Sequence, residues 1–379
     1  MGLFTILLTD NYKQLMQRDE YSEVNFIQYC DLSDIERVKE IIDYLGHEDL
    51  NILAIVSFID PYCAMAAELS AIYNRPTFTY LAMAKMQNKL ESRLCLKGTN
   101  LIPKFEIISK DLTIDLEYVK RMLPVVVKYI DSNGSKDVYL CDTLSTYHKY
   151  TQKLFEKYPE GQILIEEYMD GTQYIVEAVV KDKVVKVVGI IEQEIEFINE
   201  HFIITGYSLV TFYSDEFFNR LKKAVDTIIE KHGLENGPCH LEMRLVKGNW
   251  KLIEANPRIS GAGMNNFLKF GLGINLVSET IKFAIKGEFN LEPKQLKHTF
   301  AQYVVLSESG TLRRITGKQE VLASPEVKYV YIKPRKNTYL TPPTSLGGRY
   351  AYVIANGDTK EDARENAKRA ARKIIFHLE

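Results

Sequence analysis

The chain has few cysteines and no cysteine pattern. Its five cysteines among 379 residues are scattered, odd in number and without a Cys-x-x-Cys spacing. This excludes a disulfide framework and a cysteine-based zinc site, and it indicates reduced thiols in the cytoplasm. No apolar run approaches the roughly 20 residues that cross a membrane, and residues 3–8 lack the basic flank of a signal peptide. We therefore expect a cytoplasmic protein without a membrane partner.

An excess of either charge is also absent. The 48 Lys and Arg residues against 50 Asp and Glu give a net charge of −2, so the chain lacks the basic surface of a nucleic-acid-binding protein. No Gly-x-Gly-x-x-Gly follows the first apolar run, which argues against a dinucleotide-binding fold. The composition, 46% hydrophobic and 26% charged, is otherwise typical of globular proteins. At this length we expect two or three domains.

Two short apolar strands around Gly248 carry the most informative pattern that is present. Their junction at Lys247-Gly248-Asn249 predicts a three-residue hairpin loop. Pairing about Gly248 then places Glu242 directly across from Glu254, with Asn256 on the same face. Because two facing carboxylates repel each other, this face requires a cation such as Mg²⁺, which prefers oxygen ligands.

The alternative is a solvated sheet face whose acids are neutralised by nearby Lys or Arg residues. The residues that follow favour the cation site. Pro257 ends the second strand, Arg258 comes next, and a Ser-Gly-Ala-Gly sequence occupies 260–263. Acids, an amide, an arginine and a glycine-rich turn together are typical of a site for Mg²⁺ and phosphate.

The chain divides into three parts by its hydrophobic pattern. Residues 1–82 alternate strand-like and helical runs, including a strand at 52–58, and predict a βαβ domain with a parallel sheet. Residues 83–170 begin with a helix over 83–96 and predict a small α+β domain. Residues 171–379 predict a large antiparallel domain that ends in a helix starting at Thr359 and extending to about residue 375. The expected fold class is therefore mixed α/β and α+β.

The order of these motifs resembles the ATP-grasp superfamily, whose members usually activate a carboxylate with ATP and join it to an amine. The segment from His240 through Glu242 to Glu254-Ala-Asn256-Pro-Arg258 is similar to the family's paired metal-binding glutamates and Asn-Pro-Arg. The string at 256–261 is closest to L-amino-acid (dipeptide) ligases. The resemblance implies an ATP-grasp fold, with an N-terminal pre-grasp domain, a small clamping domain and the antiparallel domain that holds metal.

The resemblance also implies roles for the metal strand and the loop after it. Glu242 and Glu254 are expected to hold Mg²⁺, with Glu254 bridging two ions and Asn256 serving the second; Mn²⁺ is a possible substitute. Arg258 is expected to act in catalysis beside the transferring phosphoryl group. Gly261 is expected to bring its backbone close to the acyl group, so that a larger side chain there would crowd the substrate.

Two lysines and a loop are similar to the ATP clamp of the family. Lys89 is the candidate for the first ATP lysine, and Lys85 is a competing candidate on the same expected helix. Lys128 ends an apolar strand and resembles the second ATP lysine. After it, Gly134 and Ser135 would offer backbone N–H groups to phosphate oxygens.

Residues 165–171 resemble the hinge that binds adenine between two domains. Backbone groups of Glu167 and Met169 would meet the base, and Glu166 would lie near its amino group. Glu177, on the next strand, completes the expected ATP-binding set. The alternative is an ordinary strand-to-turn connection.

Three positions in this part of the chain need a separate interpretation. Gln173 stands where family members often have Glu, and Glu192-Gln193 stands where several peptide ligases have an acidic residue and Lys. His240 is expected to support the metal strand structurally and not to bind metal.

The implied activity is an ATP-dependent carboxylate–amine ligase that forms an amide or peptide bond through an acylphosphate, with amino acids as small-molecule substrates. A homodimer is compatible with the sequence. One alternative is a catalytically silent ATP-binding regulatory protein of the same fold. Another is a hydrolase that uses the close carboxylate pair for acid–base chemistry.

Overall fold

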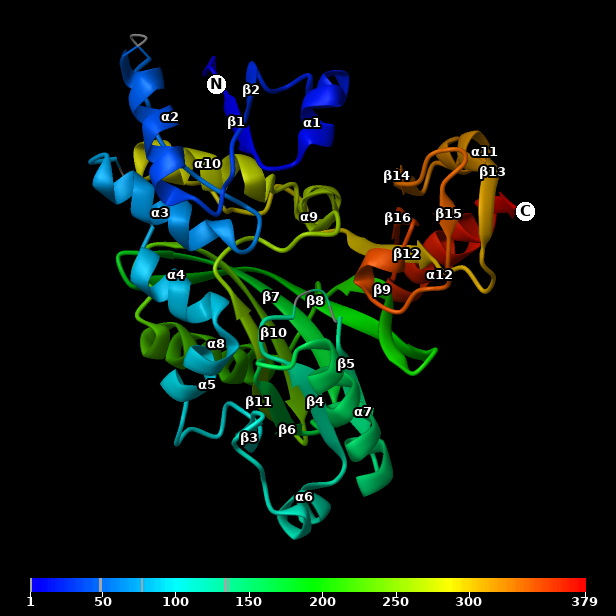
Figure 1. Ribbon diagram of the computed structural model, residues 1–379. Coiled ribbons are helices and arrows are strands. Elements are labelled where there is room, and N and C mark those ends of the chain that lie inside the picture. The colour runs from blue at the N-terminus through cyan, green and yellow to red at the C-terminus, as the bar shows by residue number, and fades with distance from the viewer. Residues whose placement is uncertain (1, 48–49, 76–77, 133, 135) are drawn as a thin grey trace.

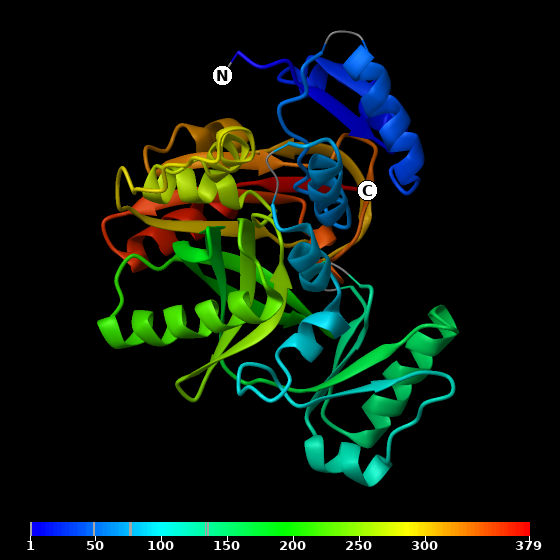
Figure 2. The ribbon, with the colours of Figure 1, turned by 90° about the vertical axis from the view of Figure 1, so that its left-hand side faces the viewer.

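The computed structural model describes residues 2–47, 50–75, 78–132, 134 and 136–379. Within these residues the strands form four sheets, of two, four, eight and three strands. Figures 1 and 2 show the eight-stranded sheet in the middle of the molecule, with the N-terminal elements at one end and the four-stranded sheet at the other. The elements that carry the expected site residues therefore meet around the central sheet.

The N-terminal region contains a small parallel sheet, as the alternating pattern predicted. Strands β1 and β2 pair in parallel, and a small core forms around Val38, Ile42 and Leu69. The strand expected at 52–58 is wrong, because these residues join no sheet. The Ser70 hydroxyl bonds to both the N–H and the carbonyl of Ile55, at 3.1 and 2.9 Å, in place of a neighbouring strand. The elements here are β1 (Ile6–Thr9), α1 (Tyr12–Met16), β2 (Phe26–Tyr29), α2 (Ile35–His47) and α3 (Tyr62–Ile72).

The single helix expected over 83–96 is two helices, α4 (Tyr80–Gln87) and α5 (Lys89–Cys95). Asn88 divides them: its backbone is extended and its side chain accepts a hydrogen bond from the Glu91 N–H at 3.0 Å, as an N-cap. Lys89 is therefore the first residue of α5 and lies on a different helix from Lys85.

The four-stranded sheet is antiparallel, in the order β3-β6-β4-β5, and has its own core. Helix α7 begins at a Thr143 capping box and packs on β4 and β5. The elements of this region follow in chain order. They are β3 (Phe105–Ile108), α6 (Leu116–Met122), β4 (Val125–Tyr129), β5 (Val138–Cys141), α7 (Leu144–Lys157) and β6 (Ile163–Glu167).

The eight-stranded sheet is antiparallel, in the order β11-β10-β7-β8-β9-β12-β16-β14. Helix α8 covers one face, where Phe217 packs edge-on against Tyr174 and Trp250. The elements of this sheet and its helices are β7 (Thr172–Lys181), β8 (Val184–Ile198), β9 (His201–Leu209), α8 (Asp215–His232), β10 (Gly237–Val246), β11 (Asn249–Asn256), α9 (Met264–Leu272), α10 (Leu276–Lys286), β12 (His298–Val304), β14 (Val327–Ile332) and β16 (Ala351–Gly357).

The C-terminal segment closes the large sheet and then adds a short one. Helix α12 (Lys360–Ala371) starts with the expected capping box between Thr359 and Asp362. It ends earlier than predicted, and β17 (Ile375–Leu378) pairs with β13 (Gly310–Thr316). The remaining elements are α11 (Lys318–Leu322), β15 (Tyr339–Leu340) and the 3₁₀ turn η2 (Leu346–Gly348). In the described parts of the chain no helix combines the length and the apolar character needed to span a bilayer.

Candidate active site

The facing glutamates predicted from the hairpin are present. Glu242 of β10 pairs directly with Glu254 of β11. The predicted three-residue loop is wrong, because Lys247 and Gly248 alone form the turn, with φ of 49° and 78°. A two-residue turn by itself would shift the pairing by one residue, but a β-bulge next to Glu242 restores it.

The carboxylate pair holds more negative charge than the protein neutralises. Desolvation and then repulsion by Glu254 raise the pKa of Glu242 to about 7. Burial acts against ionisation of Glu254 as well, but the charges of Lys89 and Lys128 outweigh it and lower that pKa. The Lys89 ammonium lies 3.2 Å from a Glu254 oxygen.

These donors fit Mg²⁺. Two carboxylates and the Asn256 amide share one face, since Asn256 pairs with His240 two residues before Glu242. Within the described residues no cluster of three or more His, Cys, Asp or Glu side chains could hold a metal by itself. A two-carboxylate set suits Mg²⁺, which usually keeps several positions for water and phosphate.

A buried cluster of ion pairs joins the four-stranded sheet to β11, the strand that carries Glu254. Glu166 of β6 lies 2.5 Å from both the Lys128 ammonium and the Arg93 guanidinium. Arg93 also donates to the Ile253 carbonyl of β11 at 2.5 Å. Burial would raise the pKa of Glu166, but Arg93 and Lys128 outweigh it and lower that pKa to about 2. Burial is also the main reason why the pKa of Lys128 is lowered.

Of the two candidate first lysines, Lys89 is the one at the carboxylates. Its ammonium contacts Glu254 and also donates to the Ser132 carbonyl, in the loop after β4. Lys85 is exposed on α4. Sequence analysis missed Arg93, although it lies four residues after Lys89 and therefore on the same helix face.

Arg244 of β10, the strand that carries Glu242, hydrogen-bonds to the residues expected to form the hinge. Its guanidinium donates to the backbone carbonyl of Met169 at 2.5 Å and to the side-chain oxygen Oε1 of Gln173 at 3.1 Å. The Gln173 amide in turn lies 3.4 Å from Glu242. A glutamate at 173 would add a third carboxylate here, so the glutamine fits the local charge. The Glu167 N–H already donates to the carbonyl of Lys104, the residue before β3, at 2.9 Å.

Arg258 is held by the N-terminal region. Two of its nitrogens contact one Asp60 oxygen, at 2.5 and 2.6 Å. The His240 ring donates from Nδ1 to the Arg258 carbonyl at 2.9 Å. Its expected structural role stays a prediction. Burial, and then the charge of Arg258, lower the pKa of His240 to about 4, so the ring is neutral near pH 7. Asp60 carried no local signal in the sequence, because its partner lies 198 residues away.

Glu177 supports the loop after Arg258. It is fully buried on the metal face, where it pairs with His240. Its carboxylate accepts hydrogen bonds from the Ser260 N–H at 3.1 Å and from the Ser260 hydroxyl. Burial raises its pKa to about 7, although both Ser260 bonds and Arg258 favour the ionised form. Its role in ATP binding stays a prediction.

The position that needs glycine in this loop is Gly263. Its φ is 83°, and a Cβ there would lie 2.0 Å from the Tyr352 hydroxyl. A Cβ on Gly261 would meet no protein atom within 4 Å. Any crowding at Gly261 would therefore have to come from a bound substrate, as the sequence interpretation assumed.

The expected phosphate-covering loop is described only in part. Ser135 lies outside the described residues. The Gly134 carbonyl accepts a hydrogen bond from the Leu346 N–H at 3.3 Å, so this loop contacts the C-terminal region. Sequence analysis gave no indication of that contact.

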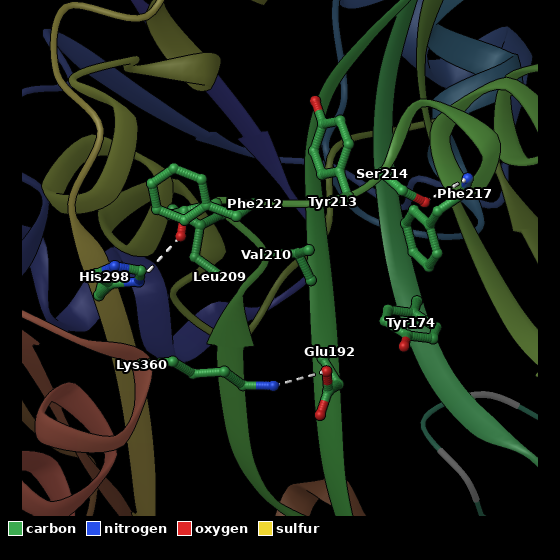
Figure 3. A pocket seen from close by; sticks show the side chains of 11 residues that line it. Tyr174, Glu192, Leu209, Val210, Phe212, Tyr213, Ser214, Phe217, His298 and Lys360 are labelled. Atoms are coloured by element: carbon green, nitrogen blue, oxygen red, sulfur yellow. Dashed lines mark hydrogen bonds and ion pairs between the residues drawn. The ribbon is translucent and has the colours of Figure 1, made fainter.

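A pocket of about 380 Å³ lies on the other face of the large sheet (Figure 3). Tyr174 and Glu192 line it, and they alternate along their strands with residues of the metal face. Glu192 forms an ion pair with Lys360 at 2.9 Å. Glu192, which belongs with Gln193 to the pair that departs from the family pattern, therefore forms an ion pair outside the metal site.

Two parts of the chain match models of known protein families. Residues 121–266 match the model of the ATP-grasp domain, and residues 302–379 match that of the L-amino acid ligase C-terminal domain 2. The chain is 25% identical over 338 residues to the uncharacterized protein y4rH of Sinorhizobium fredii (strain NBRC 101917 / NGR234), covering 87% of this chain and 69% of that protein. It is 21% identical over 262 residues to dapdiamide A synthase of Enterobacter agglomerans, covering 66% and 60%.

A solved structure has the same fold. The L-amino acid ligase from Bacillus licheniformis superposes with a TM-score of 0.80 at 21% identity, covering 94% of this chain and 88% of that one. The predicted fold class and the resemblance to ATP-grasp proteins are confirmed.

Proposed function

We propose that this ATP-grasp protein, which carries the C-terminal domain of L-amino acid ligases, joins an amino-acid carboxylate to an amine with ATP. The observation that carries the proposal is the pair Glu242–Glu254, incompletely neutralised and adjacent to Lys89, Lys128 and Arg258. Such a site suits a polyanion bound with metal. Phosphoryl transfer to a carboxylate needs no nucleophile from the protein.

The reaction takes place in two steps, activation of the carboxylate and formation of the amide. A carboxylate oxygen attacks the γ-phosphorus of ATP, the bond to the β-phosphate oxygen breaks, and ADP leaves with an acylphosphate formed. The amine nitrogen then attacks the acyl carbon, the carbon–oxygen bond to phosphate breaks, and the amine releases a proton as the amide forms.

In this scheme the protein contributes fixed positive charge and orientation. Lys89 and Lys128 would hold the phosphates, and Arg258 would steady the transferring phosphoryl group. Residues 166–169 would place the adenine, with Arg93 and Arg244 fixing that region to the metal strand. Asp60 would orient the Arg258 guanidinium, and Glu177 would hold its loop through Ser260.

The metal would be held by Glu242, Glu254 and Asn256. Mg²⁺ would supply charge neutralisation for the phosphates and for the carboxylate pair. We propose two ions, with Glu254 between them, and Mn²⁺ as a substitute. A cytoplasmic location and a homodimer remain predictions.

The silent regulatory protein is disfavoured because Lys89, which contacts Glu254, and Lys128 lie close to the carboxylate pair, as the ligase reaction would need. The hydrolase would leave Lys89, Lys128 and Arg93 without a role.

A screen of ATP hydrolysis tests the proposal. Phosphate release is measured with Mg²⁺ and each of the amino acids, singly and in pairs, and products are identified by mass spectrometry. Amine-dependent phosphate release is expected, with a product whose mass equals that of the two substrates less one water. Glu254→Gln should abolish turnover while leaving the melting temperature nearly unchanged. ATP binding without turnover in any pair would instead support the regulatory protein.

A further inference from the structure

A second group of polar side chains lies on the metal face of the large sheet, three strands away from Glu254. Glu242 pairs with Ile175 of β7, and Ile175 pairs with Ile191 of β8. Side chains alternate along a strand, so Gln193 shares this face with Glu242. Gln193 is one of the residues at which the sequence departs from the family pattern.

Gln193 is buried without a partner. It is 6% exposed, and neither its amide nitrogen nor its carbonyl oxygen has a hydrogen-bond partner. A buried amide without partners is costly, because it loses its hydrogen bonds to water and gains none in the protein. Such a residue in a candidate active site indicates a ligand with both donor and acceptor groups.

A buried guanidinium contacts the residue that pairs with Gln193 on the next strand. Tyr207 of β9 pairs directly with Gln193, and its hydroxyl accepts from the Arg349 guanidinium at 3.2 Å. Arg349 is 7% exposed, and its guanidinium lies 3.9 Å from the centre of the Tyr303 ring. Among the described residues it has no carboxylate partner in a salt bridge, unlike Arg258 and Arg93.

Arg349 is also connected to two loops of the site. It follows η2, where the Leu346 N–H bonds to Gly134 in the loop expected to cover the phosphates. The Tyr303 hydroxyl donates to the Ala262 carbonyl at 2.7 Å, in the loop after Arg258. The group formed by Arg349, Gln193 and Tyr207 is therefore bordered by both loops.

We propose that Arg349, Gln193 and Tyr207 bind the free carboxylate of the amino acid that supplies the amine. The inference rests on the proposed ligase function. Nε and Nη1 of Arg349 already donate to the Leu346 and Ile204 carbonyls, at 3.2 and 3.0 Å, which leaves Nη2 to make a charge-assisted hydrogen bond to the carboxylate. Gln193 adds an amide donor for the carboxylate and an acceptor for the ammonium or amide N–H. This group makes the enzyme select amino acids over simple amines.

The spacing suits the carboxylate that does not react. β10 and β8 are two strand spacings apart, about 10 Å in a sheet. The attacking nitrogen must lie about 3–3.5 Å from the acyl carbon at the metal. The remaining distance accommodates the α-carbon and carboxylate of the amine donor, whereas the carboxylate to be activated must lie at Glu242 and Glu254 themselves.

The test separates activation from amine capture. Hydroxylamine replaces the amine donor and traps the acylphosphate as a hydroxamate, without needing a carboxylate subsite. The active amino-acid pair from the screen is then used in two forms, with the amine donor as the free acid or as its carboxamide.

Arg349→Met should raise the KM for the free-acid donor about 10- to 100-fold, as expected for a lost charge-assisted hydrogen bond. The wild-type preference for the free acid over the carboxamide should disappear, while the hydroxamate rate stays within twofold. Gln193→Leu should cause a smaller loss of the same kind. Arg364→Met, which removes an arginine half-exposed on α12, is the matched control and should change neither.

Equal loss of hydroxamate formation and amide formation in Arg349→Met, with Arg349→Lys restoring both, would overturn the inference and place Arg349 in carboxylate activation. An unchanged KM for the free acid would also overturn it. A wild-type chain that forms no hydroxamate with any carboxylate would overturn the proposed function itself, which is a different result.

Discussion

Replacing Glu177 by glutamine should change how the stability of the large domain depends on pH. The carboxylate is fully buried, and its hydrogen-bond partners are the N–H and hydroxyl of Ser260. A glutamine carbonyl can accept from the same N–H, and its amide can donate to the same hydroxyl. The substitution therefore removes the charge and keeps the hydrogen bonds.

The magnitude follows from the pKa. Burial raises the pKa of Glu177 from 4.5 to about 7. The folded chain therefore binds this proton more tightly than the unfolded chain does. The resulting stabilisation is fully present below the unfolded value near 4.5 and is lost as pH rises through about 7. The loss totals about 3 kcal/mol, from 1.36 kcal/mol for each pKa unit.

The single tryptophan allows the stability of the large sheet, which contains Glu177, to be measured. Trp250 is buried in β11, within the large sheet, so its fluorescence follows unfolding of that sheet during urea titration. Free energies of unfolding are measured at pH 5, 6, 7 and 8. Glu177→Gln should gain stability relative to the wild type by about 3 kcal/mol between pH 5 and pH 8.

Glu242, whose pKa is also raised to about 7, is present in both proteins and cancels in the comparison. Ser260→Ala removes a donor that favours the ionised carboxylate, so it should raise the pKa of Glu177 further and make the loss of stability at high pH larger than in the wild type. A difference between wild type and Glu177→Gln that stays constant from pH 5 to pH 8 would refute the reasoning.

Three further substitutions test the site. Lys128→Met should weaken ATP binding at least tenfold, measured by calorimetric titration, because it removes a buried charge worth about 1.5–3 kcal/mol to a phosphate; unchanged affinity would reject the clamp. Asp60→Asn should lower kcat about 10- to 100-fold with little change in ATP affinity, since only the orientation of its arginine partner is lost; an equal loss of ATP affinity would argue for a nucleotide contact. Gly263→Ala should destabilise the fold by about 1–3 kcal/mol through its left-handed backbone and the contact with a tyrosine hydroxyl, whereas Gly261→Ala should leave thermal stability nearly unchanged.

Local patterns predicted most of the fold. Helix α8 and the start of α12 follow from apolar spacing, a capping serine or threonine and a terminal glycine, all within a few residues. The strand expected at 52–58 failed because the hydroxyl of Ser70, on a helix, satisfied its backbone. The helix expected over 83–96 was broken by Asn88, a capping signal inside an otherwise helical pattern.

The sequence by itself determined the charged strand pair, because residues on a hairpin are neighbours through the turn between them. It determined the facing of Glu242 and Glu254, although a bulge and not the loop length sets that register. Only the tertiary structure brought Asp60 to Arg258, and Tyr207 to Arg349. These pairs are joined by the packing of whole elements across the large sheet, which no spacing along the chain records.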